Sequence, residues 1–247
     1  MKRPTLVIGV SIAAFAVVVF LVFNLFVGRQ KKAPEYYDIA VPEPSGLCFS
    51  ADGRGLWTVS DRTGEVVQIS FDGEVLTKFT LKDVDFEGIA VYDDTTLALS
   101  REGKPAVMFV STSGNVLRDQ HIDLDLKSNS GLEGIAFVKK ENIFILAQEK
   151  KPRRLIEVDA TSFEVKREIK IGKNFPDISD IWYDERSDQL WILSDQGEFV
   201  ARCSRDGEMI KKHKLKIEKL EGVCVDPSKR KIYTVSDKLA AMFVFEY

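Results

Sequence analysis

Glu133-Gly134-Ile135-Ala136-Phe137 is one copy of a five-residue pattern that recurs along the chain. Successive copies begin 42 to 46 residues apart, and the other four are Ser45–Phe49, Glu87–Val91, Ser179–Tyr183 and Glu221–Val225. Self-similarity with a period of this length is typical of repeat proteins. The pattern therefore divides the chain after residue 35 into five equivalent units.

A second apolar run follows in every unit and ends in Ser-Asp or a related polar pair. These ends are Ser60-Asp61, Ser100-Arg101, Gln148-Glu149, Ser194-Asp195 and Ser236-Asp237. A third β-branched run and, in four units, a fourth complete the unit, with turn signals such as Asp52-Gly53 between runs. Four strands in roughly 40–50 residues are typical of one propeller blade. The sequence predicts an all-β protein, a five-bladed β-propeller with four-stranded blades over residues 35–247.

The two ends of this region complement each other. The fifth unit stops after its third strand, Met242–Glu246, whereas one extra strand, Tyr36–Val41, precedes the first unit. Pairing the two removes an open sheet edge and closes the ring. We expect the N-terminal strand to complete the last blade.

The first segment has a different composition. Residues 5–27 carry no charge, Lys2 and Arg3 precede them, and Arg29 follows. A helix of 23 residues rises roughly 35 Å, enough to cross a hydrocarbon core. We predict a transmembrane signal-anchor helix over residues 5–27, within an anchor and linker over residues 1–34; a cleavable signal peptide is the alternative. The expected location is the bacterial inner membrane, single-pass, with the propeller on the periplasmic (extracytoplasmic) side.

Composition narrows the function classes. The formal net charge is -3 over 247 residues, so binding of nucleic acid is not expected. Three scattered cysteines do not make a disulfide framework or a zinc site, and Cys48 and Cys224 are expected to be free thiols. The two histidines, His121 and His213, fall in predicted outer strands and are expected at the surface, far from the channel.

Carboxylates recur at two positions of the repeat. The innermost strand of a blade lines the channel, and its start lies on the same face of the disc as the end of the second strand. An inner ring is therefore expected from the strand starts Glu87, Glu133 and Glu221, completed by Ser45 and Ser179. A wider ring is expected from the second-strand ends Asp61, Glu149, Asp195 and Asp237. Blade two has Arg101 at this position, which would relieve part of the charge repulsion.

Carboxylates brought this close repel one another, by about 3 kcal/mol for a pair 5 Å apart at an effective dielectric near 20. Oxygen donors without nearby histidine or cysteine suit Ca²⁺ better than zinc. The predicted metal ligands are Glu87, Glu133, Glu221, Ser179, Asp61, Glu149, Asp195 and Asp237. The alternative is that these residues serve only as strand caps and turn residues.

The repeated motifs resemble those of the SdiA-regulated family of bacterial proteins. The resemblance rests on Phe86–Ile89, Leu132–Ile135, Asp177–Ser179 and Leu220–Val223, and on the strand ends Leu193-Ser194 and Val235-Ser236. It implies a five-bladed propeller with a bound Ca²⁺ and no established activity. The family is distantly similar to NHL-repeat propellers, some of which are metal-dependent enzymes.

Three functions are compatible with these features. The first is a membrane-anchored module that binds Ca²⁺ at an acidic channel mouth and holds a ligand or protein partner there. The second is a Ca²⁺-dependent hydrolase of a lactone, ester or phosphoester. The third is a metal-free scaffold. No nucleophile–base pair stands out in the sequence, which favours binding, although propellers host many unrelated functions.

Overall fold

The computed structural model describes residues 32–82, 85–101, 103–126, 131–149 and 152–247. Residues Pro34–Tyr247 form one compact unit. The predicted transmembrane helix over residues 5–27 lies outside the described residues, and no helix within them is long and apolar enough to span a membrane.

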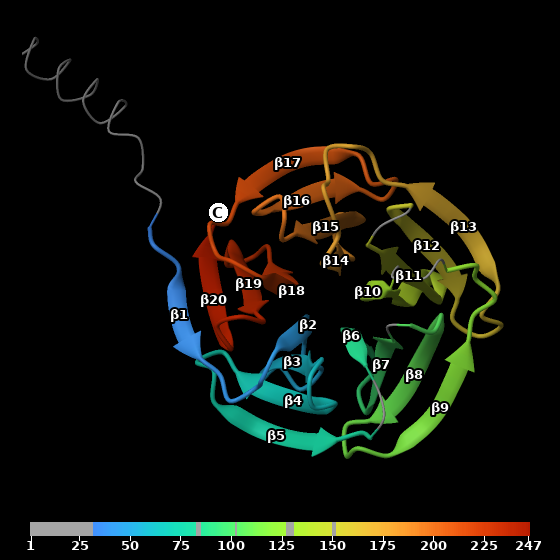
Figure 1. Ribbon diagram of the computed structural model, residues 1–247, viewed down its shortest axis with the longest axis horizontal. Coiled ribbons are helices and arrows are strands. Elements are labelled where there is room, and N and C mark those ends of the chain that lie inside the picture. The colour runs from blue at the N-terminus through green and yellow to red at the C-terminus, as the bar shows by residue number, and fades with distance from the viewer. Residues whose placement is uncertain (1–31, 83–84, 102, 127–130, 150–151) are drawn as a thin grey trace, which may run out of the picture. The chain divides into compact units, whose positions relative to one another are not determined.

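The compact unit is a ring of five antiparallel sheets of four strands each, which confirms the predicted fold (Figure 1). Blade one consists of β2 (Pro44–Phe49), β3 (Gly55–Ser60), β4 (Glu65–Ser70) and β5 (Val75–Thr80). Blade two consists of β6 (Phe86–Asp93), β7 (Thr96–Arg101), β8 (Ala106–Ser111) and β9 (Val116–His121). Blade three consists of β10 (Leu132–Val138), β11 (Ile143–Gln148), β12 (Arg154–Asp159) and β13 (Val165–Lys170), with the short helix η1 (Lys139–Glu141) between its first two strands.

Blade four consists of β14 (Asp180–Asp184), β15 (Gln189–Ser194), β16 (Phe199–Ser204) and β17 (Met209–Lys214). Blade five consists of β18 (Leu220–Asp226), β19 (Lys231–Ser236), β20 (Ala241–Glu246) and, from the other end of the chain, β1 (Glu35–Asp38). In β1, Glu35 is opposite Val244 and Asp38 is opposite Ala241. The N-terminal strand therefore completes the last blade, as predicted, although it is shorter than the run Tyr36–Val41.

The core lies between the blades. A middle strand of a blade is covered on both faces by its neighbours, and all six residues of β11 are buried. The outer strands β5 and β9 are mostly exposed. Burial of each large aliphatic side chain contributes about 1.5–3 kcal/mol, so packing between blades fixes the inner strands around the axis.

Glycine follows the first residue of the pattern because the inner strands approach closely. The strand register shifts around this position in four blades, as in a β-bulge. Gly46 has a φ of +53°, and a Cβ atom there would lie 2.7 Å from the carbonyl oxygen of Glu87 in the next blade. A side chain would not fit without moving the backbone.

Two smaller predictions have different outcomes. Cys48, Cys203 and Cys224 are buried free thiols, which agrees with the prediction for Cys48 and Cys224. His213 was expected at the surface, and this is wrong, since it is only 7% exposed. Its ring packs 5.6 Å from that of Trp191 and 5.0 Å from that of Tyr247, because the C-terminal residue covers this outer strand.

Candidate functional site

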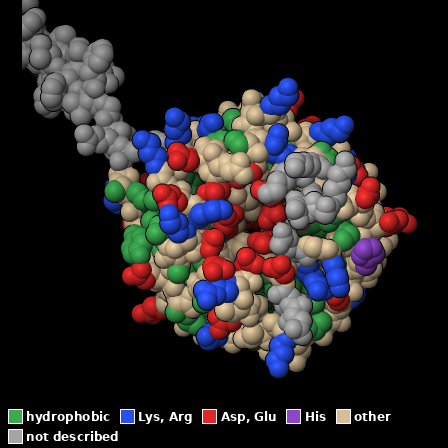
Figure 2. All heavy atoms as spheres, in the orientation of Figure 1, with side chains coloured by type: hydrophobic (Ala, Val, Ile, Leu, Met, Phe, Trp, Pro, Cys, Tyr) green, Lys and Arg blue, Asp and Glu red, His purple; other side chains and the backbone are tan. Residues whose placement is uncertain are grey.

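Acidic side chains gather around a cavity of about 270 Å³ at the centre of one face of the disc (Figure 2). Every residue of the two predicted rings lines it: Ser45, Asp61, Glu87, Glu133, Glu149, Ser179, Asp195, Glu221 and Asp237. The lining also includes Glu43, Asp177, Gln196 and Lys219. The propeller thus brings together carboxylates that are far apart along the chain.

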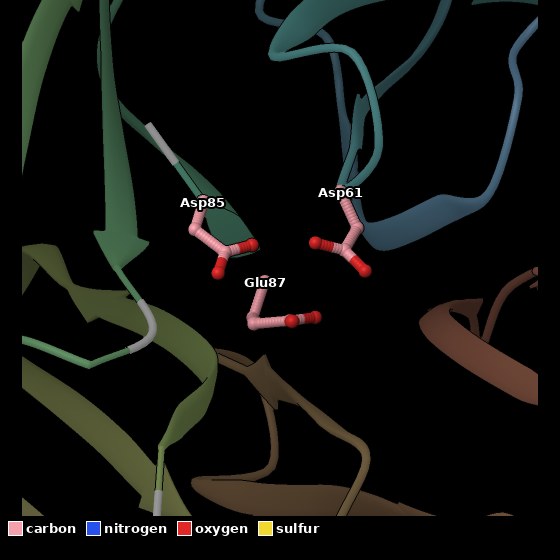
Figure 3. A group of neighbouring side chains, drawn as sticks. All are labelled: Asp61, Asp85 and Glu87. Atoms are coloured by element: carbon pink, nitrogen blue, oxygen red, sulfur yellow. The ribbon is translucent and has the colours of Figure 1, made fainter. Parts of the chain in front are cut away.

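The tightest group of carboxylates lies between blades one and two (Figure 3). Asp61 follows β3, Asp85 precedes β6, and Glu87 is the second residue of β6. One oxygen from each lies within 4.8 Å of the others. At this separation each ionised pair repels by about 3 kcal/mol or more, which favours a cation or a proton among the three oxygens.

Ser45 serves this group as a hydrogen-bond donor. Its hydroxyl oxygen lies 2.9 Å from Glu87 Oε2 and 2.9 Å from the carbonyl oxygen of Glu87, so the hydroxyl can donate to either. Ser179 holds the same position in blade four and bonds to the carboxylate of Glu221. In both cases a serine orients the glutamate of the following blade.

The blade-five side of the cavity contains a lysine. Lys219 Nζ lies 3.6 Å from Glu221 Oε1 and 4.0 Å from Asp195 Oδ2. Burial raises the pKa of Glu221 to about 7, against the opposing effect of Lys219, and the charges of Asp195 and Asp237 raise it further. The Glu221 carboxylate in turn raises the pKa of Lys219. This side therefore carries its own counter-ion.

Arg101 does not have the role expected for it. Its Nη1 lies 2.6 Å from Asp119 Oδ2 on β9, so the guanidinium is directed toward the outer strand of its own blade. Arg101 does not line the cavity. Among the described residues that do line it, the positively charged one is Lys219.

Asp85 and Lys219 were not among the predicted site residues, although the repeat contains a signal for both. Each stands two residues before the inner-ring residue of its blade, and Glu43 and Asp177 hold the same position in blades one and four. Residues two apart in an extended chain face the same side. Asp177 has a structural role, since its carboxylate accepts hydrogen bonds from the Ser194 hydroxyl and, at 3.1 Å, from the Gln196 backbone N–H.

The donor chemistry of the cavity suits a hard cation. Carboxylate and hydroxyl oxygens dominate the lining, and histidine and cysteine are not part of it. Ca²⁺ takes six to eight such oxygens in flexible geometry, whereas zinc prefers nitrogen and sulfur. All eight predicted ligands line the cavity, and two of them, Asp61 and Glu87, belong to the tightest group. Their role as ligands stays a prediction.

Comparison with known proteins agrees with this architecture. The family model named SdiA-regulated matches residues 37–245. Among solved structures, the glutaminyl cyclase of Myxococcus xanthus superposes with a TM-score of 0.70 at 12% identity, covering 86% of this chain and 94% of that one. Virginiamycin B lyase from Staphylococcus aureus gives 0.51 at 17% identity, covering 85% of this chain and 69% of that one. At these identities the two structures show a shared fold alone.

Proposed function

Because this chain belongs to the SdiA-regulated family and gathers its carboxylates at one channel mouth, we propose that it is a propeller that binds Ca²⁺ there. The cation reduces repulsion among the acidic side chains and offers remaining coordination positions to a ligand or protein partner. The cavity volume of about 270 Å³ is enough for a small polar group of such a ligand.

The group formed by Asp61, Asp85 and Glu87 is the observation that carries this proposal. Three carboxylate oxygens within 4.8 Å make a partial coordination shell for a cation with 2.3–2.6 Å metal–oxygen distances. Lys219, by contrast, contacts Asp195 of blade four and Glu221 of blade five. Ser45 fixes one oxygen of Glu87.

A calcium titration of the full chain in detergent tests the proposal. A ligand that binds only the folded state at 100 times its Kd adds about 2.7 kcal/mol to the free energy of unfolding, equivalent to a rise in Tm of roughly 5–10 °C. EGTA should reverse the rise, and Mg²⁺ at the same concentration should give less. An unchanged Tm, with no calcium in elemental analysis of the purified protein, would exclude the proposal.

The apolar run over residues 5–27 supports a second part of the proposal, a membrane anchor with the propeller outside the cytoplasm. The run is long enough to span a bilayer and is flanked by basic residues. Full-length protein should stay in the membrane pellet after alkaline carbonate extraction, and added protease should reach the propeller in spheroplasts. Release by carbonate would contradict anchoring.

Hydrolysis is the alternative function, and the pKa of Glu221 is the observation in its favour. A carboxyl that titrates at about 7 can take or give a proton at neutral pH. A panel of lactones, aryl esters and phosphoesters should then reveal turnover that Glu221→Gln lowers by 100-fold or more. Turnover that is unchanged by E221Q would remove this carboxyl from any mechanism.

A further inference from the structure

Blade four departs from the repeat at the channel axis. The position after the inner-ring residue is Gly46, Gly88, Gly134 and Gly222 in the other blades. In blade four it is Asp180, which is 1% exposed. Two residues later Trp182 replaces a small residue, which is Cys48, Ala90, Ala136 or Cys224 in the other blades. Both changes add side-chain volume next to the channel.

The Asp180 carboxylate contacts several blades at once. Its Oδ2 accepts a hydrogen bond of 2.8 Å from the Val223 N–H in blade five. The backbone N–H groups of Leu47 in blade one and Ile181 in blade four bond to the same carboxylate. Its Oδ1 lies 2.9 Å from where a Cβ atom of Gly134 in blade three would stand. One side chain therefore touches four blades of the ring.

These backbone donors converge because of the repeat itself. Leu47, Ile181 and Val223 each follow the repeat glycine or, in blade four, the Asp180 that replaces it, and the nitrogens of Ile89, Ile135 and Ile181 each lie close to the glycine of the preceding blade. Successive N–H groups that face one point form an anion-binding concavity. A buried N–H group without an acceptor costs free energy, so the N–H groups of Leu47, Ile181 and Val223 need the acceptor that Asp180 provides.

Trp182, two residues after Asp180, contacts an aromatic ring of blade one. Its ring lies 6.3 Å from that of Phe49 in blade one, in an edge-to-face arrangement, although blades one and four are not neighbours. Both rings line an apolar recess of about 150 Å³ formed by the inner strands beyond the acidic cavity. The Trp182 and Phe49 rings therefore link blades one and four by a direct aromatic contact.

We propose that the Asp180 carboxyl is an internal hydrogen-bond acceptor for the backbone N–H groups of Leu47, Ile181 and Val223, and that it acts as a positioning residue for the acidic cavity. Val223 lies two residues after Glu221, and Leu47 lies two residues after Ser45, which holds Glu87. By holding these two strands at a fixed separation, Asp180 sets the spacing of the carboxylates on opposite sides of the cavity. The effect of Asp180 on cation binding rests on the proposed function, whereas its role as acceptor of the backbone N–H groups does not.

Chemical rescue tests directly whether the backbone N–H groups need the acceptor that Asp180 provides. Asp180→Gly restores the residue of the other blades and leaves the N–H groups without their acceptor, so the Tm should fall by roughly 5 °C or more in metal-free buffer. Formate, which has the size and the acceptor oxygens of the missing carboxyl, should recover at least half of this loss and should leave the Tm of the wild-type protein unchanged. If D180G folds only when formate is present, the yield of refolded protein is the readout.

Two further variants make the test specific. Asp184→Gly removes another buried carboxylate of β14, whose oxygens accept bonds from the Arg186 N–H and the Ser187 hydroxyl in a surface turn. D184G should lose stability without recovery in formate. Asp180→Asn keeps one acceptor oxygen and should retain more stability than D180G. Equal losses in D180N and D180G, or no recovery of D180G in formate, would overturn the proposal.

The positioning role has its own readout. The Kd for Ca²⁺ should rise about tenfold in D180G and return toward the wild-type value in formate, since loss of a residue that orients metal ligands typically costs 10–100-fold in metal affinity. D180G could have a normal Kd for Ca²⁺ and still have a Tm that is lowered and then restored by formate. That result would support Asp180 as the acceptor of the backbone N–H groups and would contradict its positioning role. Wild-type protein that binds no Ca²⁺ would refute the proposed function. Formate rescue of D180G would still test whether the backbone N–H groups need an acceptor.

Discussion

The blade-two and blade-five sides of the acidic cavity are built from the same repeat but differ in charge. In blade two, Asp85 precedes Glu87 by two residues, and both approach Asp61 of blade one within 4.8 Å. In blade five, Lys219 holds the position of Asp85 and contacts Glu221 at 3.6 Å. One side concentrates negative charge and the other neutralises part of it.

This difference shows how a repeat acquires asymmetry without a change of fold. Equivalent positions of the repeat lie at equivalent points around the channel mouth. A substitution at one of them therefore changes the local charge without changing the fold. A cation is expected where the carboxylates are closest together. The cavity is therefore a polarised site, with the proposed Ca²⁺ on the side of blades one and two.

The largest expected effect comes from loss of one carboxylate of the blade-two group. Asp85→Asn removes a negative charge from the proposed coordination shell and should raise the Kd for Ca²⁺ by about 100-fold, measured by isothermal titration calorimetry. Asp237→Asn makes the same change on the blade-five side of the cavity and should raise the Kd by less than about fivefold. Similar losses in D85N and D237N would contradict a polarised site.

The sequence predicts part of this site. The repeat register predicts the ring, the closure by β1 and the carboxylates Glu87, Glu133 and Glu221 around one mouth, because these follow from where each strand begins. The same register places Asp85 and Lys219 two residues before inner-ring residues. Which charged side chains these two approach depends on side-chain distances, which the sequence does not give.

Other features could not be predicted, because they depend on contacts across the ring. The pairing of Arg101 with Asp119 depends on which way a long side chain extends from a strand end. The contact of Asp180 with the Val223 N–H joins residues 43 apart in sequence. The burial of His213 requires the position of Tyr247, which the pattern of one blade does not give.

A smaller effect, of opposite sign, is expected from removal of the lysine. Lys219→Met removes a positive charge from the cavity and should lower the Kd for Ca²⁺ by about three- to tenfold, because the charge acts across a partly screened distance. Lys216→Met changes an exposed lysine outside the cavity lining and should leave the Kd unchanged. An increase in the Kd of K219M would mean that the lysine organises the site and does not compete with the cation.

A separate effect concerns stability and pH in the absence of metal. Burial raises the pKa of Glu221 from 4.5 to about 7, so the folded state binds more protons than the unfolded state between these values. Stability therefore decreases as the pH rises from 4.5 to 7, by at most about 3 kcal/mol. Glu221→Gln has no proton to lose and should flatten the decrease in Tm over this window. A parallel pH profile in E221Q would assign the titration to another group.

Crystals of the protein grown with Ca²⁺, measured at a wavelength where calcium scatters anomalously, provide the most direct test of a polarised cation site. We expect one anomalous peak within about 2.3–2.6 Å of oxygens from Asp61, Asp85 and Glu87, and none beside Lys219. A peak among Glu221, Asp195 and Asp237, or no peak at the channel mouth, would contradict it.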